Sequence, residues 1–149
     1  MKQFTYKHTL IACFFGYIVQ AIINNFIPLL FLTFQSSYGI PLSQITFLVT
    51  FNFGLQLLVD LISPSFIDKI GYRASMIIAH LCAAAGLIGL AFFPEILPSP
   101  LAGLMLSVII YAIGGGLLEV LVSPIVEACP TDNKESAMSL YIPFIAVAM

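Results

Sequence analysis

The residues of this sequence best placed to do chemistry are ionisable side chains inside long apolar stretches. Asp60, His80 and Glu119 each lie about seven to ten residues from one end of such a stretch, which is roughly 10–15 Å along a helix. Inside a membrane, an ionisable group costs about 2.5–3.5 kcal/mol and usually faces a cavity or a partner. A carboxyl group in that position can bind a solute or exchange a proton. We therefore predict that Glu119 contacts a substrate or a coupling proton.

Neutral polar residues with regular spacing form a second group. Asn52, Gln56 and Asp60 follow one another at four-residue intervals, so a helix would place them in one stripe. The predicted substrate- or proton-binding set is Glu119, Asn25, Asn24, Gln20, Asp60, Gln56 and Asn52. For Asp60, a structural pair with His80 on the neighbouring helix is the alternative.

Glu119 stands between two features that interrupt regular helix packing. Gly114–Gly116 precede it, and missing side chains allow close helix contact or access to a cavity. Pro124 follows it and frees a backbone carbonyl in the preceding turn. The first apolar run repeats this arrangement with Asn24-Asn25 and Pro28. Interrupted helices at corresponding positions point to a transporter site.

The composition indicates that these residues lie in a membrane. Sixty per cent of the 149 residues are apolar and 8% are charged, whereas a soluble domain carries roughly a quarter charged residues. Such a surface needs lipid rather than water. The net charge of -2 does not indicate a nucleic-acid partner. Cys13, Cys82 and Cys129 fall in or beside apolar runs, so we expect small buried hydrophobes rather than a disulfide framework.

Motifs of enzymes and cofactor sites are missing from the sequence. It has no glycine-rich phosphate loop with a lysine, no His and Cys residues at metal-ligand spacing, and no plausible Ser, His and Asp set. We therefore expect no enzymatic activity, no cofactor and no metal.

Four apolar runs are long enough to cross a membrane, since a spanning helix needs about 20 such residues. They cover approximately residues 9–34, 45–67, 74–93 and 101–126, and in lipid each must be helical. A fifth run over 137–149 is too short to span, and we expect the start of a fifth helix, with a re-entrant end as the alternative. The predicted fold class is an all-α membrane protein, with four complete transmembrane helices and a truncated fifth in one bundle over residues 1–149.

The basic residues indicate how the spans are oriented. Four spans place the N-terminus, the second loop and the segment after the fourth span on one side. All five basic residues fall there: Lys2, Lys7, Lys69, Arg73 and Lys134. The loops 35–43 and 94–100 contain none. Because basic residues favour the cytoplasmic side, we expect a multi-pass plasma-membrane protein with a cytoplasmic N-terminus.

The charged loop between the second and third spans carries a recognisable motif. Residues 64–73, PSFIDKIGYR, match the pattern G-x-x-x-D-(R/K)-x-G-(R/K)-(R/K) at Asp68, Lys69, Gly71 and Arg73. They depart from it at Pro64 and Tyr72. In its sequence, length and side of the membrane, this loop resembles that of the major facilitator superfamily.

Several residues of this loop have a physical explanation that does not depend on the family resemblance. Gly71 suits a tight turn between antiparallel helices, and Asp68 can bond to free amides at the start of the next helix. Lys69 and Arg73 can pair with an acid on a neighbouring helix end, with Glu127 as the candidate. The resemblance implies a cytoplasmic gating role for these five residues as a latch of one alternating state. A plain turn and anchor is the alternative.

The resemblance also implies the larger architecture. Members of the superfamily have twelve helices in two halves that rock about a central site. The chain would then be an N-terminal fragment of a secondary transporter. Its expected partners are the lipid bilayer, a small solute and the missing C-terminal helices.

The fourth span resembles one branch of that superfamily more specifically. Glu119, Ser123 and Pro124 are similar to the E-x-x-x-N-P element of the fucose permease branch of sugar–proton symporters, with serine in place of asparagine. The resemblance implies a sugar substrate and a proton as coupling ion. Asn25 stands where that branch has an acid on the first helix, and it cannot ionise.

Two other functions are compatible with four spans. One is a complete small four-helix transporter that acts as a dimer, similar to the small multidrug-resistance proteins. That resemblance implies an essential glutamate in the first span, which here has no acid. A non-transporting membrane scaffold would need no buried acids. It would therefore tolerate substitution of Asp60 and Glu119.

Overall fold

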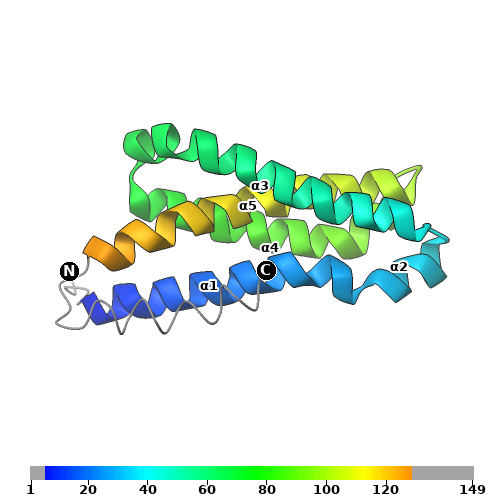
Figure 1. Ribbon diagram of the computed structural model, residues 1–149, viewed down its shortest axis with the longest axis horizontal. Coiled ribbons are helices and arrows are strands. Elements are labelled where there is room, and N and C mark those ends of the chain that lie inside the picture. Colours follow the sequence, from blue (N-terminus) through cyan, green and yellow to red (C-terminus); the bar gives the residue numbers. More distant parts are fainter. Residues whose placement is uncertain (1–5, 129–149) are drawn as a thin grey trace.

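The computed structural model describes residues 6–128, without the side chains of residues 6, 7 and 31, and all regular structure in this range is helical. Five helices follow one another: α1 Tyr6–Leu29, α2 Phe31–Tyr38, α3 Leu42–Ile70, α4 Tyr72–Ile96 and α5 Pro100–Ala128. The four long helices run along the length of the molecule, and the short helix α2 lies at one end (Figure 1).

The four long helices have the length and composition of membrane spans. The spanning segments are His8–Leu29, Leu42–Ile70, Tyr72–Ile96 and Pro100–Glu127. The start of α1, the α3–α4 turn and the end of α5 lie at one end of the bundle (Figure 1). The predicted all-α membrane protein with four spans is confirmed. The predicted fifth helix at 137–149 lies outside the described residues, as do Lys2, Lys134 and Cys129.

The first span ends earlier than predicted. The apolar run over 9–34 predicted one helix, but α1 ends at Leu29 and α2 starts two residues later. Pro28 lies in the last turn of α1 and has no N–H to continue the helical ladder. The N–H of Leu30 is then shared between the carbonyls three and four residues before it, each at 3.1 Å. The helix is thus interrupted just after a proline, inside the apolar run.

The loop after the first span is shorter than the polar residues 35–43 predicted. Helix α2 continues through Tyr38, and α3 begins at Leu42. Gly39 ends α2 in the left-handed conformation, with φ of 63°, and its N–H bonds to the carbonyl of Gln35. Phe34 of α2 is buried in the apolar core. This burial holds α2 against the bundle.

The turn between α3 and α4 is a single residue. The sequence predicted a six-residue loop from Asp68 to Arg73, but α3 continues to Ile70 and α4 begins at Tyr72. Gly71 joins them with φ of 88° and ψ of 152°, a region that side chains disfavour. The predicted cap by Asp68 is wrong, because Asp68 is part of α3 and no side chain caps α4.

Helix α5 is the centre of the bundle and is the most buried of the spans. It packs most extensively against α4, then against α3 and α1. Along the α4–α5 seam, a Cβ added at Gly86 would lie 2.4 Å from the backbone nitrogen of Tyr111. One added at Gly114 would lie 2.6 Å from the carbonyl oxygen of Ala79. The small residues therefore permit the close helix contact that the sequence predicted.

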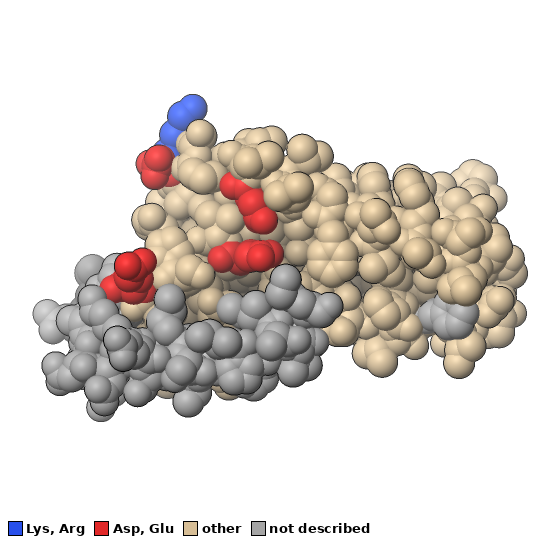
Figure 2. Space-filling view, viewed as in Figure 1, with Lys and Arg blue, Asp and Glu red and all other residues tan. Residues whose placement is uncertain are grey.

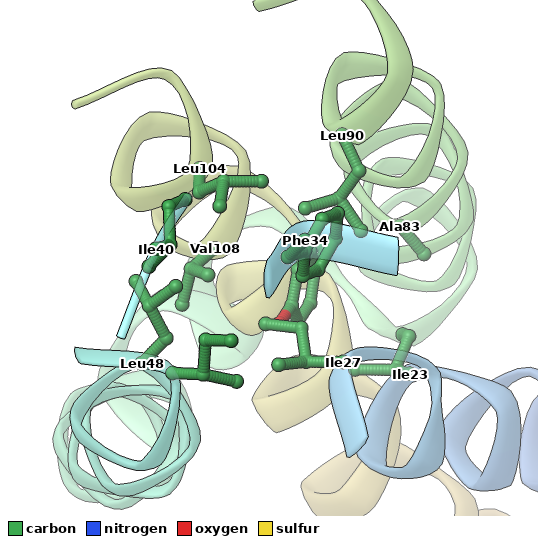
Figure 3. Close-up of a cluster of buried hydrophobic side chains, with 11 residues drawn as sticks. Ile23, Ile27, Phe34, Ile40, Leu48, Ala83, Leu90, Leu104 and Val108 are labelled. Carbon is green, nitrogen blue, oxygen red and sulfur yellow. The ribbon is translucent and has the colours of Figure 1, made fainter. Parts of the chain in front are cut away.

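The main apolar core lies toward the α2 end of the molecule. All five helices contribute to it, and Figure 3 shows Ile27, Phe34, Leu48, Leu90 and Leu104 converging there. The outer faces carry exposed apolar side chains, as a lipid-facing surface requires: Leu57, Leu61, Leu81, Ile88 and Ile96.

Candidate functional site

The polar residues of α1 and α3 face one another across the bundle. Gln20 and Asn24 are one helical turn apart on α1, and Asn52 and Gln56 are one turn apart on α3. Gln20, Asn52 and Gln56 are buried, and Asn24 is half-buried. Burial of carboxamides is unfavourable unless they form hydrogen bonds.

Gln56 is the hub of the hydrogen bonds among these side chains. Its Nε2 donates to Asn24 Oδ1 at 2.9 Å and to Asn52 Oδ1 at 3.1 Å. Its Oε1 accepts from Gln20 Nε2 at 3.4 Å. The same Gln20 nitrogen donates to Glu119 Oε2 at 3.2 Å, which brings α5 into the set. We call Gln20, Asn24, Asn52, Gln56 and Glu119 the amide network.

Glu119 is the exposed member of the amide network. It lies on the one side of α5 that the described helices leave exposed, although α5 is otherwise the most buried span. Asp60 of α3 is near enough for its charge to interact with that of Glu119. Figure 2 shows acidic side chains gathered on this face, toward the end with the α3–α4 turn. Asp60 Oδ1 is buried and has no hydrogen-bond partner in the described part of the chain.

One predicted contact is absent, and one residue of the predicted set bonds within its own helix. Asn25, predicted with Asn24, instead donates to the carbonyl of Ala21 on its own helix at 2.9 Å. His80 bonds to the carbonyl of Met76 at 2.9 Å, again within one helix. The predicted Asp60–His80 pair is therefore not formed. Both residues thus bond to a backbone carbonyl one turn earlier in their own helix.

Sequence reasoning missed one contact beside the amide network. The hydroxyls of Tyr17 on α1 and Ser123 on α5 are 3.4 Å apart. Tyr17 precedes Gln20 by three residues, and Ser123 follows Glu119 by four. Helical spacing therefore puts each on the same face as its network neighbour. That spacing was the available signal.

The predicted gating residues lie at one end of the bundle and are well exposed. This holds for Asp68, Lys69, Arg73 and Glu127, while Gly71 is half-buried. Figure 2 shows a basic side chain at the end where α3 turns into α4. Within the described residues, neither Lys69 nor Arg73 forms an ion pair, so the predicted contact with Glu127 is absent.

The chemistry available to the amide network is recognition by hydrogen bonds. It holds carboxamides and a carboxylate, which together offer both donors and acceptors. Within residues 6–128, no group of three or more His, Cys, Asp or Glu side chains could hold a metal ion.

Comparison with known proteins agrees with this architecture. The family model of the Major Facilitator Superfamily matches residues 2–149, which is nearly the whole chain. No curated protein and no solved structure shows a significant match. The family consists of secondary transporters of small solutes. With its four apolar spans, the chain is a multi-pass membrane protein that belongs to the major facilitator superfamily.

Proposed function

We propose that this chain is the N-terminal part of a secondary transporter and that its solute contacts Glu119 and the neighbouring carboxamides. The main support is the amide network itself. It joins three spans by hydrogen bonds and ends in a carboxylate that the described helices leave exposed. Polar groups that converge in an otherwise apolar bundle are typical of solute sites. Alternating access would open this site to each side of the membrane in turn.

The specific solute class that we propose is a sugar, taken up together with a proton. Sugar hydroxyls both donate and accept hydrogen bonds, as do the carboxamides of the amide network. The resemblance of Glu119, Ser123 and Pro124 to the sugar–proton element supports the same class. Asn25 cannot ionise and bonds to its own helix. We therefore assign proton exchange to Glu119 rather than to α1.

The remaining parts of the proposal concern the rest of the transporter. Glu119 and Ser123 are exposed on α5, and we propose that further helices of the same transporter cover them. The exposed charges of Asp68, Lys69, Arg73 and Glu127 lie at one end of the bundle, where they would contact other helix ends in one of the alternating states. The placement of basic residues supports a cytoplasmic N-terminus in the plasma membrane.

The test is the substitution Glu119→Gln in the full-length protein, with uptake of radiolabelled hexoses and 6-deoxyhexoses measured at several pH values. We expect uptake to fall by about tenfold or more, because a hydrogen bond to a charged group contributes about 1.5–3 kcal/mol. The remaining uptake should not depend on pH. Glu95→Gln, at the exposed far end of α4, is the matched control. Unchanged uptake and unchanged pH dependence in Glu119→Gln would refute the proposal and favour a membrane scaffold.

A further inference from the structure

The three consecutive glycines of α5 face different surroundings, although both Gly115 and Gly116 approach Gln56. A Cβ added at Gly114 would lie 2.6 Å from the backbone of α4, at Ala79 and Ala83. One added at Gly116 would lie 2.9 Å from Val59 of α3. One added at Gly115 would instead lie 3.1 Å from two carboxamide atoms, Gln20 Oε1 and Gln56 Nε2. The middle glycine thus faces the amide network.

The kind of atom that each glycine faces determines whether an added side chain would displace a helix or only neighbouring side chains. At Gly114, the neighbours are backbone atoms, which can move only if a helix moves. At Gly115, the two nearest atoms are the ends of flexible glutamine side chains, which can give way by a few tenths of an ångström. The third neighbour is a side chain as well, Ile23 Cγ2 at 3.3 Å. A methyl group at Gly115 would therefore leave the helix backbones in place, displace the two carboxamides and press on Ile23.

Such a displacement would affect the longest hydrogen bonds of the amide network, which are those of Gln20. Gln20 Nε2 is 3.4 Å from Gln56 Oε1 and 3.2 Å from Glu119 Oε2, close to the outer limit for a hydrogen bond. Gln20 Oε1 is buried and finds no hydrogen-bond partner among the described residues. The Gln20 carboxamide is thus held by two long bonds and by its contact with the surface of α5 at Gly115.

We infer that Gly115 is a positioning residue of the proposed site: it acts through Gln20 and Gln56 to keep the amide donor on Glu119. The inference rests on the proposed function for its effect on transport. Its structural half, the placement of the two carboxamides, can be tested without a substrate.

The experiment compares Gly115→Ala with Gly54→Ala in the full-length protein. A Cβ at Gly54 would meet no described atom within 4 Å, so this variant controls for the replacement of a helical glycine. Side-chain amide NMR signals of ¹⁵N-glutamine-labelled protein report on the carboxamides, with Gln20→Leu and Gln56→Leu providing the assignments. Sugar uptake gives KM and Vmax, and thermal melting reports on the fold.

For Gly115→Ala we expect the Gln20 and Gln56 amide signals to move and the melting temperature to stay near that of Gly54→Ala. The KM for the transported sugar should rise about fivefold to tenfold at nearly constant Vmax, as for the loss of roughly one hydrogen bond. In a Gln20→Leu background, Gly115→Ala should add little further loss, because the two changes break the same link.

Unmoved amide signals would overturn the inference, as would a full additional loss in the Gln20→Leu background. If the wild-type protein takes up none of the sugars, the proposed sugar transport fails instead. The amide signals and the melting temperature then decide the role of Gly115 alone.

Discussion

The two sides of α5 are packed in different ways. On the α4 side, glycines bring backbone against backbone, with a Cβ at Gly86 only 2.4 Å from the next helix. On the side of α1 and α3, carboxamides meet through hydrogen bonds that reach 3.4 Å. Close apolar contacts cannot be lengthened without loss of packing, whereas hydrogen bonds between side chains can be exchanged for bonds to a solute or to water. The proposed binding therefore lies on the side of α5 that faces α1 and α3, where hydrogen bonds rather than backbone contacts join the helices.

The largest effect is expected from a side chain added where α4 and α5 pack most closely. Gly86→Ala places a methyl group 2.4 Å from the Tyr111 nitrogen and 2.5 Å from its Cβ. We expect the free energy of unfolding to fall by about 3 kcal/mol or more, at the upper end for overpacked cores. Thermal melting of the purified protein measures the effect, with Gly54→Ala as the control. Melting indistinguishable from that of the control would show that the seam is looser than described.

A smaller effect, on the KM of uptake, should distinguish Asn24, which belongs to the amide network, from Asn25, which does not. Asn24 accepts a 2.9 Å hydrogen bond from Gln56, whereas its neighbour Asn25 bonds only to the backbone of its own helix. Asn24→Ala should raise the KM of uptake about fivefold, since a buried donor of Gln56 loses its partner. Asn25→Ala should change the KM by less than about twofold. Equal effects of the two substitutions would contradict the assignment of network members.

The spans could be predicted from the sequence, because the length of each apolar run can be read directly from the order of the residues. Their ends could not. Helix α1 ends one residue after Pro28, inside an apolar run, and Gly71 reduces a charged loop to one residue. In both cases, local backbone geometry overrides the polarity of the residues.

The arrangement of the polar side chains could be predicted only in part. Helical spacing placed Asn52 and Gln56 on one stripe, and they do share hydrogen bonds. Spacing cannot tell which neighbouring helix a side chain reaches. It therefore suggested an Asp60–His80 pair, although His80 bonds to its own helix.

The central claim is that a solute occupies the face of α5 beside the amide network. Ser123 is exposed on this face and lies 3.4 Å from the Tyr17 hydroxyl. The most direct measurement is the rate at which a membrane-impermeant thiol reagent modifies Ser123→Cys in the full-length protein, with the native cysteines replaced. The same rate is measured for Ser65→Cys, an exposed position on α3. Saturating amounts of a transported sugar should slow modification at Ser123→Cys about fivefold and leave Ser65→Cys unchanged. Equal rates at Ser123→Cys with and without the sugar would contradict the claim.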